Sequence, residues 1–330
     1  MYAVQQVRPL PRSLFHLAAL TYLTGAAGMV ASFFYLASTS RLDVAAGAAG
    51  FVAGSVLAAA GLLSMTSLLR MPAGLAPVDA TVSARPGYTP TAVMERWLAH
   101  YRRNRDNRPE PNWTAPITLD ADVIRPLVRS LEQFQLGDGG GPASLIAWNA
   151  EWLRSANPRS RELVDTWFRE EKEHSRLLGA AVDRFGGRCI RGHWSFTVFC
   201  QVRRWIGVRF ELTVLLLTEI VSTVYYRLLR RHGQDPALRA MCKLILRDES
   251  GHVAMHRDRL ADLAKTGQAV YGPLWEIRFR ALGLAAATKL WINHAPGLKA
   301  VGATRGEFYR DIWLELTRFV RRLRSEASAG

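Results

Sequence analysis

The chain has 330 residues, enough for one large domain or two of ordinary size. It carries 43 Lys and Arg residues against 28 Asp and Glu residues, a net charge of +15, so nucleic acid, anionic lipid or an acidic carrier protein must be considered as a partner. There is no zinc-finger spacing and no aromatic RNA-binding box, which argues against nucleic acid. The three cysteines have no Cys-x-x-Cys spacing, as expected in a reducing compartment without structural disulfides or a thiolate metal site.

Two long uncharged segments lie near the N-terminus. Residues 13–40 and 44–69 contain no Asp, Glu, Lys or Arg, and each is longer than the roughly 20 residues that a helix needs to cross a bilayer. The first segment is too long for the apolar part of a cleaved signal peptide. Glycine and alanine residues in both segments would allow the two helices to approach closely. The sequence therefore predicts a two-span transmembrane hairpin over residues 1–70.

Basic residues flank this hairpin on one side. Arg8 and Arg12 precede the first segment and Arg70 follows the second, whereas the turn between them has only Arg41, which Asp43 balances. Loops with excess Lys and Arg stay in the cytoplasm. We therefore expect a multi-pass protein of the inner (cytoplasmic) membrane, with both termini and the soluble domain on the cytoplasmic side.

Residues 71–120 form a basic, proline-rich linker. It contains a predicted short amphipathic helix over residues 90–103, which begins with proline at the first helical position. Trp97, Tyr101 and the arginines that follow suit the surface of an anionic leaflet, and a helix exposed to solvent is the alternative.

From residue 121 to residue 330 the pattern is helical, with almost no strand signal. The predicted helices lie near residues 121–137, 143–156, 158–183, 196–231, 236–265, 274–292 and 305–325. Clusters of Gly, Pro, Asn and Asp between them are typical of turns. The predicted fold class is therefore all-α, and a region of about 200 residues is large enough for a bundle with its own core.

Two copies of a Glu-x-x-His motif lie in this region, at Glu171–His174 and Glu249–His252. Residues three apart share one face of a helix, so the carboxylate and the imidazole of each pair can reach one metal ion. A single copy arises often by chance. Two copies 78 residues apart, each with a carboxylate some 30 residues upstream, are a much stronger indication of a metal site.

Glu219 is the expected upstream carboxylate for the second motif. Its neighbours on the helix are apolar or neutral, so the carboxylate would be buried, where an ionised group needs a compensating cation. Glu211, the competitor on the same helix, has arginines around it. We therefore expect Glu211 to be solvated or to lie behind the ligands.

Two candidates remain upstream of the first motif, Asp138 and Glu132. The helix face of Asp138 carries apolar residues, whereas that of Glu132 includes Arg125 and Arg129, so Asp138 is preferred. Residues 139–142, Gly-Gly-Gly-Pro, disfavour a continuous helix there. A kink at this point would be one way for a short Asp side chain to reach the metal.

The segments around these motifs resemble the ferritin-like di-iron carboxylate superfamily. Residues 167–178, Trp-Phe-Arg-Glu-Glu-Lys-Glu-His-Ser-Arg-Leu-Leu, are similar to the metal-binding helix of acyl-carrier-protein desaturases, and residues 247–252, Arg-Asp-Glu-Ser-Gly-His, resemble the matching helix. Residues 134–138, Phe-Gln-Leu-Gly-Asp, look like the Phe-Gln-x-Gly-Glu segment of small bacterial ferritin-like proteins, as do residues 293–296, Asn-His-Ala-Pro. Asp at position 138 and the glycine run after it depart from the family pattern.

This resemblance covers about residues 120–310 and implies a ferritin-like four-helix bundle with extra C-terminal helices over residues 121–330. It implies two Fe ions (Fe²⁺/Fe³⁺), bridged by Glu171 and Glu249; whether iron or manganese occupies the site stays open. The ligand set that it implies is Asp138, Glu171, His174, Glu219, Glu249 and His252, with Glu132 as the alternative to Asp138. Oxygen ligands stabilise the oxidised metal, and neutral imidazoles moderate the charge.

Three further residues have predicted roles around these ligands. Asp248 and Glu170 each precede a bridging glutamate, and each could accept the N–H of the histidine on the opposite helix. His256 lies one turn beyond His252. It could be an extra ligand, a proton donor or a histidine on the same inward stripe, and the last interpretation is preferred.

The resemblance implies an O₂-dependent di-iron oxidoreductase, a desaturase or hydroxylase, that acts on a lipid-like or carrier-bound aliphatic substrate. Electrons would come from an external reductase, because no flavin or iron–sulfur motif is visible. One alternative is a rubrerythrin-like ferroxidase or peroxidase, against which the missing Cys₄ rubredoxin module argues. Another is a metal-free bundle that serves as a membrane scaffold. Association as a homodimer stays open.

Overall fold

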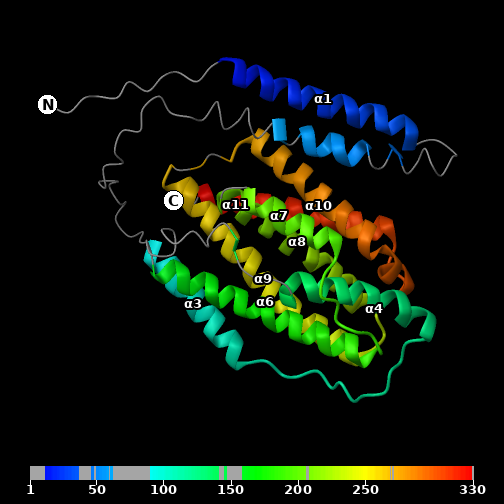
Figure 1. Ribbon diagram of the computed structural model, residues 1–330. Helices are drawn as coiled ribbons and strands as arrows, with labels where there is room; N and C mark the ends of the chain where they lie inside the picture. Colours follow the sequence, from blue (N-terminus) through cyan, green and yellow to red (C-terminus); the bar gives the residue numbers. More distant parts are fainter. Residues whose placement is uncertain are drawn as a thin grey trace. The chain divides into compact units, whose positions relative to one another are not determined.

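The computed structural model describes residues 12–36, 46–47, 50–58, 60–61, 90–140, 145–146, 158–205, 208–267, 269 and 271–328. These residues form helices and the turns and loops between them, with no strand among them, which confirms the all-α class for this part of the chain (Figure 1). The chain divides into two compact units, Met1–Ala84 and Arg85–Gly330.

The first unit contains helix α1 (Arg12–Leu36) and a helical stretch at residues 50–58. The two approach so closely that a Cβ atom added at Gly25 would overlap the backbone of Ala58 and Gly54. Outward-facing side chains such as Leu20 and Val52 are more than 60% exposed. The second predicted span, residues 44–69, lies partly outside the described residues.

Within the described ranges, one helix is long and apolar enough to cross a membrane by length and composition, namely α8 (Val208–His232). In its most apolar 18-residue window, 67% of the residues are buried within the protein. A core helix of a bundle has the same composition, because it is apolar on most sides. We therefore treat α8 as a core helix.

The second unit is a helical bundle. Besides α8 it consists of α3 (Pro90–Asp106), α4 (Ala121–Gln135), the π-helical turn η1 (Leu136–Gly140), α6 (Pro158–Arg184), α7 (Trp194–Trp205), α9 (Pro236–Lys265), α10 (Pro273–Ala300) and α11 (Arg305–Ser328). Helix α8 packs against α9, and α4 packs against both α6 and α10. Helix α11 contacts α8, α9 and α10. Fully buried side chains from five of these helices meet in the core: Leu131, Leu178, Val224, Ile245 and Ile312.

The helix boundaries differ from the sequence prediction at two places. The predicted helix 196–231 is two helices, α7 and α8. The predicted end near residue 292 is wrong, because α10 continues through Pro296 to Ala300. Gly297 explains this difference, since a side chain there would meet Ser130 and the backbone of Pro126 on α4. The glycine allows two helices to cross closely and does not end α10. The predicted helix 143–156 lies almost wholly outside the described residues.

Helix α3 belongs to the second unit and covers α6 and α9. The side chains of Trp97 and Tyr101 are 8% and 1% exposed and pack with Trp167 of α6 and Met255 of α9. The prediction that these two rings face a leaflet or solvent is therefore wrong. Apolar burial against two helices outweighs the basic character of the segment.

Candidate metal centre

Six carboxylate and imidazole side chains meet in the interior of the second unit. They come from four places along the chain: Asp138 from η1, Glu171 and His174 from α6, Glu219 from α8, and Glu249 and His252 from α9. Two groups of three have ligand atoms that all lie within 4.8 Å of one another, Asp138–Glu171–His174 and Glu171–Glu219–His252. Both histidines are 0% exposed.

His252 faces three of the carboxylates through one ring nitrogen. Its Nδ1 lies 3.0 Å from Glu171 Oε1, 3.4 Å from Glu219 Oε2 and 3.7 Å from Glu249 Oε2. Trp167 donates a hydrogen bond of 3.1 Å from Nε1 to Glu171 Oε1, which fixes the orientation of that carboxylate.

His174 occupies the corresponding position in the other half. Its Nδ1 lies 3.6 Å from Glu171 Oε2 and 3.8 Å from Glu249 Oε1. Glu171 and Glu249 therefore approach both histidines, which is the arrangement that bridging ligands need. The ring centroids of His174 and His252 are 5.7 Å apart.

The π-helical turn η1 brings Asp138 to the cluster. Gly139 makes this possible, because a Cβ atom there would lie 3.1 Å from Lys172 Cα on α6. Tyr226 Oη donates a hydrogen bond of 2.7 Å to Asp138 Oδ2. Extra residues inserted into a helical turn occur often at functional sites, where they redirect a side chain.

Two buried atoms in the cluster lack a hydrogen-bond partner among the described residues, Nδ1 of His174 and Oε2 of Glu249. Buried polar atoms are nearly always paired, so each such atom needs an explanation. A metal ion that these atoms coordinate would supply one. Carboxylate oxygens together with imidazole nitrogens suit iron and manganese, so the donor set fits the predicted pair of ions.

The pKa values of the cluster reflect its excess of acidic groups. Burial and the nearby charge of Glu219 hold the pKa of Glu249 well above its usual range, and burial beside Glu171 raises the pKa of Asp138 to about 7. Burial alone would lower the pKa of His174, but its contacts with Asp248 and Glu171 raise that pKa well above the ordinary value. Protons or cations must therefore compensate the carboxylates, and divalent cations can take the place of the protons.

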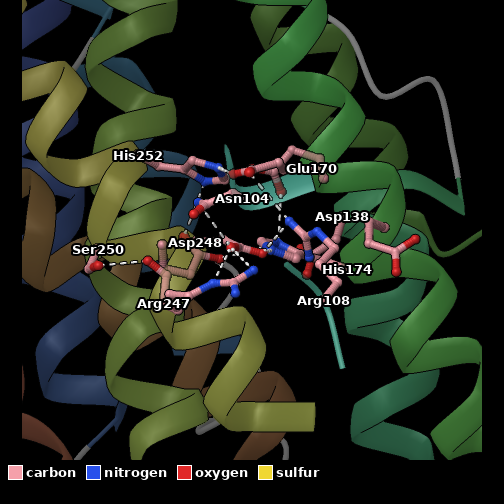
Figure 2. A network of polar contacts seen from close by, with 12 residues as sticks. Asn104, Arg108, Asp138, Glu170, His174, Arg247, Asp248, Ser250 and His252 are labelled. Carbon is pink, nitrogen blue, oxygen red and sulfur yellow. Dashed lines mark hydrogen bonds and ion pairs between the residues drawn. The ribbon is translucent and has the colours of Figure 1, made fainter. Parts of the chain in front are cut away.

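Asp248 and Glu170 lie at the outer nitrogens of the two histidines. His174 Nε2 is 3.1 Å from Asp248 Oδ2, and His252 Nε2 is 3.0 Å from Glu170 Oε2 (Figure 2). An ionised carboxylate can only accept, so each histidine donates its Nε2–H to the outer carboxylate, and Nδ1 faces the carboxylates of the cluster. Each carboxylate stands on the helix opposite its histidine, as the sequence indicated.

Arg108, which the sequence analysis did not identify, joins these two outer carboxylates. Its Nη2 lies 2.6 Å from Asp248 Oδ2 and 3.3 Å from Glu170 Oε1, and its side chain is 13% exposed. Arg247 and Asn104 also contact Asp248, at 3.1 Å and 3.4 Å (Figure 2). No spacing in the sequence marks Arg108, because it follows α3 and reaches the site only through the packing of that helix.

Three other predicted residues lie away from the ligands. Glu132 accepts a hydrogen bond from the backbone N–H of Arg188, so the structure brings Asp138 and not Glu132 to the cluster. Of the two alternatives expected for Glu211, solvation is wrong, because the residue is 0% exposed and pairs with Arg203 at 2.7 Å. His256 packs edge-on against Trp167, and neither ring nitrogen has a hydrogen-bond partner among the described residues.

A cavity of about 270 Å³ opens onto the cluster and is called the apolar cavity below. Asp138, Glu171, Glu219 and Glu249 form part of its wall. Most of the remaining wall is aromatic or aliphatic and includes Phe134, Trp167, Phe168, Phe196, Phe199 and Leu215. The residues of α10 that border it are Ala286, Lys289, Leu290, Asn293 and His294.

Comparison of the chain with protein-family models, curated proteins and solved structures finds no match. The resemblance to the ferritin-like superfamily therefore stays a prediction from the motifs. The functional proposal depends on the geometry of the cluster and of the cavity beside it.

Proposed function

We propose that this protein is a membrane-anchored di-iron oxidoreductase of ferritin-like architecture, an O₂-dependent desaturase or hydroxylase with a lipid-like aliphatic substrate. The observation that carries the proposal is the convergence of five ligand-type side chains in two overlapping groups, with Glu249 within 4 Å of both histidines. His174 Nδ1 and Glu249 Oε2 lack a hydrogen-bond partner there. A bound ion would account for both atoms.

The bound metal pair would supply O₂ activation, and the chain's own residues have three separate tasks. Asp138, Glu171, His174, Glu219, Glu249 and His252 would hold the ions. Asp248 and Glu170 orient the histidines and keep their protons on Nε2. The side chains around the apolar cavity exclude water from the reacting atoms.

The apolar cavity supports an organic substrate. Its volume has room for roughly nine water-sized groups, enough for a segment of an acyl or isoprenoid chain. Desaturation would remove two hydrogen atoms from such a chain and, with two electrons and two protons from a reductase, reduce O₂ to two water molecules. Hydroxylation would insert one oxygen atom and release the other as water, with the same two electrons and two protons.

A location in the inner membrane is part of the proposal. The uncharged segments 13–40 and 44–69 support it, together with the close contact between α1 and the helical stretch at residues 50–58. The basic flanks favour a cytoplasmic second unit. Exposed Cys189 provides the test. A membrane-impermeant maleimide should label it only after spheroplasts are broken, and labelling of intact spheroplasts would contradict the orientation.

Anaerobic titration with Fe(II), followed by Mössbauer spectroscopy, tests the metal assignment. We expect two coupled irons per chain in the wild-type protein. The variant Glu249→Ala should lose paired binding and keep its helix content, because it removes a ligand to both ions. Ser250→Ala, the exposed neighbour on α9, is the matched control and should bind two irons. Equal iron content in all three proteins would contradict the assignment, and no iron in any of them would favour a scaffold.

Oxygen uptake separates the redox alternatives. A desaturase or hydroxylase should consume O₂ in proportion to a modified lipid product when a lipid extract and a reductant are supplied. A ferroxidase or peroxidase would turn over Fe(II) or peroxide without any lipid product.

A further inference from the structure

Helix α10 carries an apolar stripe on the side that faces away from the bundle. Its members recur at helical spacing and are all exposed: Leu274, Ile277, Ala281, Ala285 and Ile292. The three largest of these side chains are 60%, 65% and 69% exposed, for Leu274, Ile277 and Ile292 respectively. The stripe spans 19 residues, Leu274 to Ile292, which is about 27 Å of helix.

Exposed tryptophans paired with cations border this stripe. Lys289 of α10 lies over the ring of Trp194, which is 68% exposed, at 5.3 Å from its centroid. Arg280 of α10 lies 5.8 Å from the ring centroid of Trp313 on α11, which is 48% exposed. Tryptophan and basic side chains around an apolar strip are typical of a helix that lies in the headgroup region of a bilayer.

One residue at the edge of the stripe also borders the apolar cavity. Lys289 stands at the edge of the stripe and also borders the cavity, together with Leu290 and Asn293 of the same helix. A chain that leaves the cavity beside Lys289 would therefore emerge next to Ile292 and Trp194.

Charge favours a lipid leaflet over a second copy of this chain as the occupant of the stripe. The chain has a net charge of +15, and the stripe is bordered by Arg280 and Lys289, so two copies would bring like charges together. An anionic leaflet instead attracts basic residues at its surface. The same chain contains two uncharged segments long enough to span the bilayer.

We infer that the outer stripe of α10, with Trp194 and Trp313, lies on the surface of an anionic membrane leaflet, so that the apolar cavity opens directly into lipid. This inference depends on the membrane location in the proposed function and on its lipid-like substrate, but not on the metal ions. It assigns the entry route of the substrate.

Lipid quenching of a fluorophore tests the inference in the full-length protein, reconstituted into nanodiscs that contain anionic phospholipid. Cys189, Cys200 and Cys242 are first replaced by alanine, and bimane is attached at Ile277→Cys or Ile292→Cys. The control is Asp122→Cys on α4, whose native side chain is 96% exposed. Spin-labelled phospholipid should cause loss of bimane emission at positions 277 and 292 and none at position 122.

Two outcomes would overturn the inference. One is bimane emission at 277 and 292 that responds to aqueous iodide and not to spin-labelled lipid, which would leave the stripe in solvent. The other is shielding from both quenchers, which would mean that protein covers it. Circular dichroism of each labelled protein verifies that its helices are folded, whether or not it holds metal. The same measurement on Glu249→Ala should show unchanged lipid quenching, so failure of the metal assignment and failure of this inference give different results.

Discussion

The two sides of the metal cluster have opposite chemistry. Towards α7 and α10 the ligand carboxylates face the apolar cavity. Towards α3 the outer carboxylates Glu170 and Asp248 face Arg108 in a network of ion pairs. The difference indicates that the two sides have separate roles. One side admits an apolar chain, and the other holds the histidines in position.

The buried histidines differ in the direction of their pKa shifts. Carboxylates raise the pKa of His174 and His252 well above the ordinary value, although burial opposes the shift. Burial lowers the pKa of His256 well below the ordinary value and that of His294, on the cavity side, to about 3. The surroundings of a histidine in this interior therefore decide the direction of its pKa shift in the metal-free protein.

Loss of Asp248 should have the largest effect. Asp248 is 0% exposed and pairs with His174, Arg108 and Arg247, so Asp248→Ala leaves buried cations without a partner. We expect a decrease of about 3–5 kcal/mol in the free energy of unfolding, measured by urea denaturation. Asp165→Ala is the control, because Asp165 is 58% exposed and pairs with the exposed Arg161. An equal decrease in the free energy of unfolding of both variants would show that the network around Asp248 stabilises the fold no more than a surface ion pair does.

Arg108→Ala should have a smaller effect on folding and a clear effect on metal binding. Without Arg108 the carboxylates of Asp248 and Glu170 lose a shared cation, and the orientation of both histidines loosens. We expect metal affinity to fall about 10- to 100-fold in a competition titration with a chelator. Arg105→Ala, which removes an exposed arginine paired only with its neighbour Asp106 among the contacts described, should bind like the wild type. Unchanged metal affinity in Arg108→Ala would show that Arg108 does not contribute to metal binding.

On the cavity side, Ala286→Trp should reduce turnover and leave metal binding intact. Ala286 borders the apolar cavity and lies on α10, whereas the outer carboxylates Glu170 and Asp248 lie on α6 and α9. Filling the cavity should lower substrate-dependent O₂ uptake about tenfold, with two irons still bound. Ala121→Trp, at the exposed first residue of α4 and outside both the cavity wall and the stripe, is the control. Loss of iron in Ala286→Trp would mean that the two sides are not independent.

The smallest expected effect is a pH dependence from His294. Its pKa in the folded protein is about 3, below the ordinary value of 6.5, so the unfolded chain binds the proton more readily. This histidine therefore favours folding most above pH 6.5, and its contribution declines as pH falls towards 3. Between pH 8 and pH 6 the wild-type protein should lose about 1 kcal/mol more stability than His294→Gln, measured by urea denaturation at both values. An equal loss of stability in the two proteins between pH 8 and pH 6 would contradict a buried neutral His294.

The sequence predicted most of the helices and the residues that gather in the cluster, because both depend on local spacing. The Glu-x-x-His pairs are periodic on α6 and α9, and the contacts of Asp248 and Glu170 follow from their positions before Glu249 and Glu171. Arg108 could not be found in this way, since its approach depends on how α3 packs across two distant helices. The prediction that Trp97 and Tyr101 face a leaflet or solvent failed for the same reason.

Glycine gave the least reliable local signal. Gly297 indicated a turn from sequence but lies within α10, where it allows contact with Ser130 on α4. Gly139 indicated a break and does lie in a π-helical turn, where its small size allows contact with α6. Only the neighbouring helix distinguishes the two cases, and a single chain segment does not contain that information.

The exchange of carboxylates between α6 and α9 has a consequence for assembly. Glu170 of α6 holds the histidine of α9, while Asp248 of α9 holds the histidine of α6. Neither helix can complete its own half without the other, so a fragment that ends after α7 and a fragment that begins at α8 should each be unable to retain metal. Mixing the two fragments should restore both half-sites together, because each half-site contains side chains from both fragments.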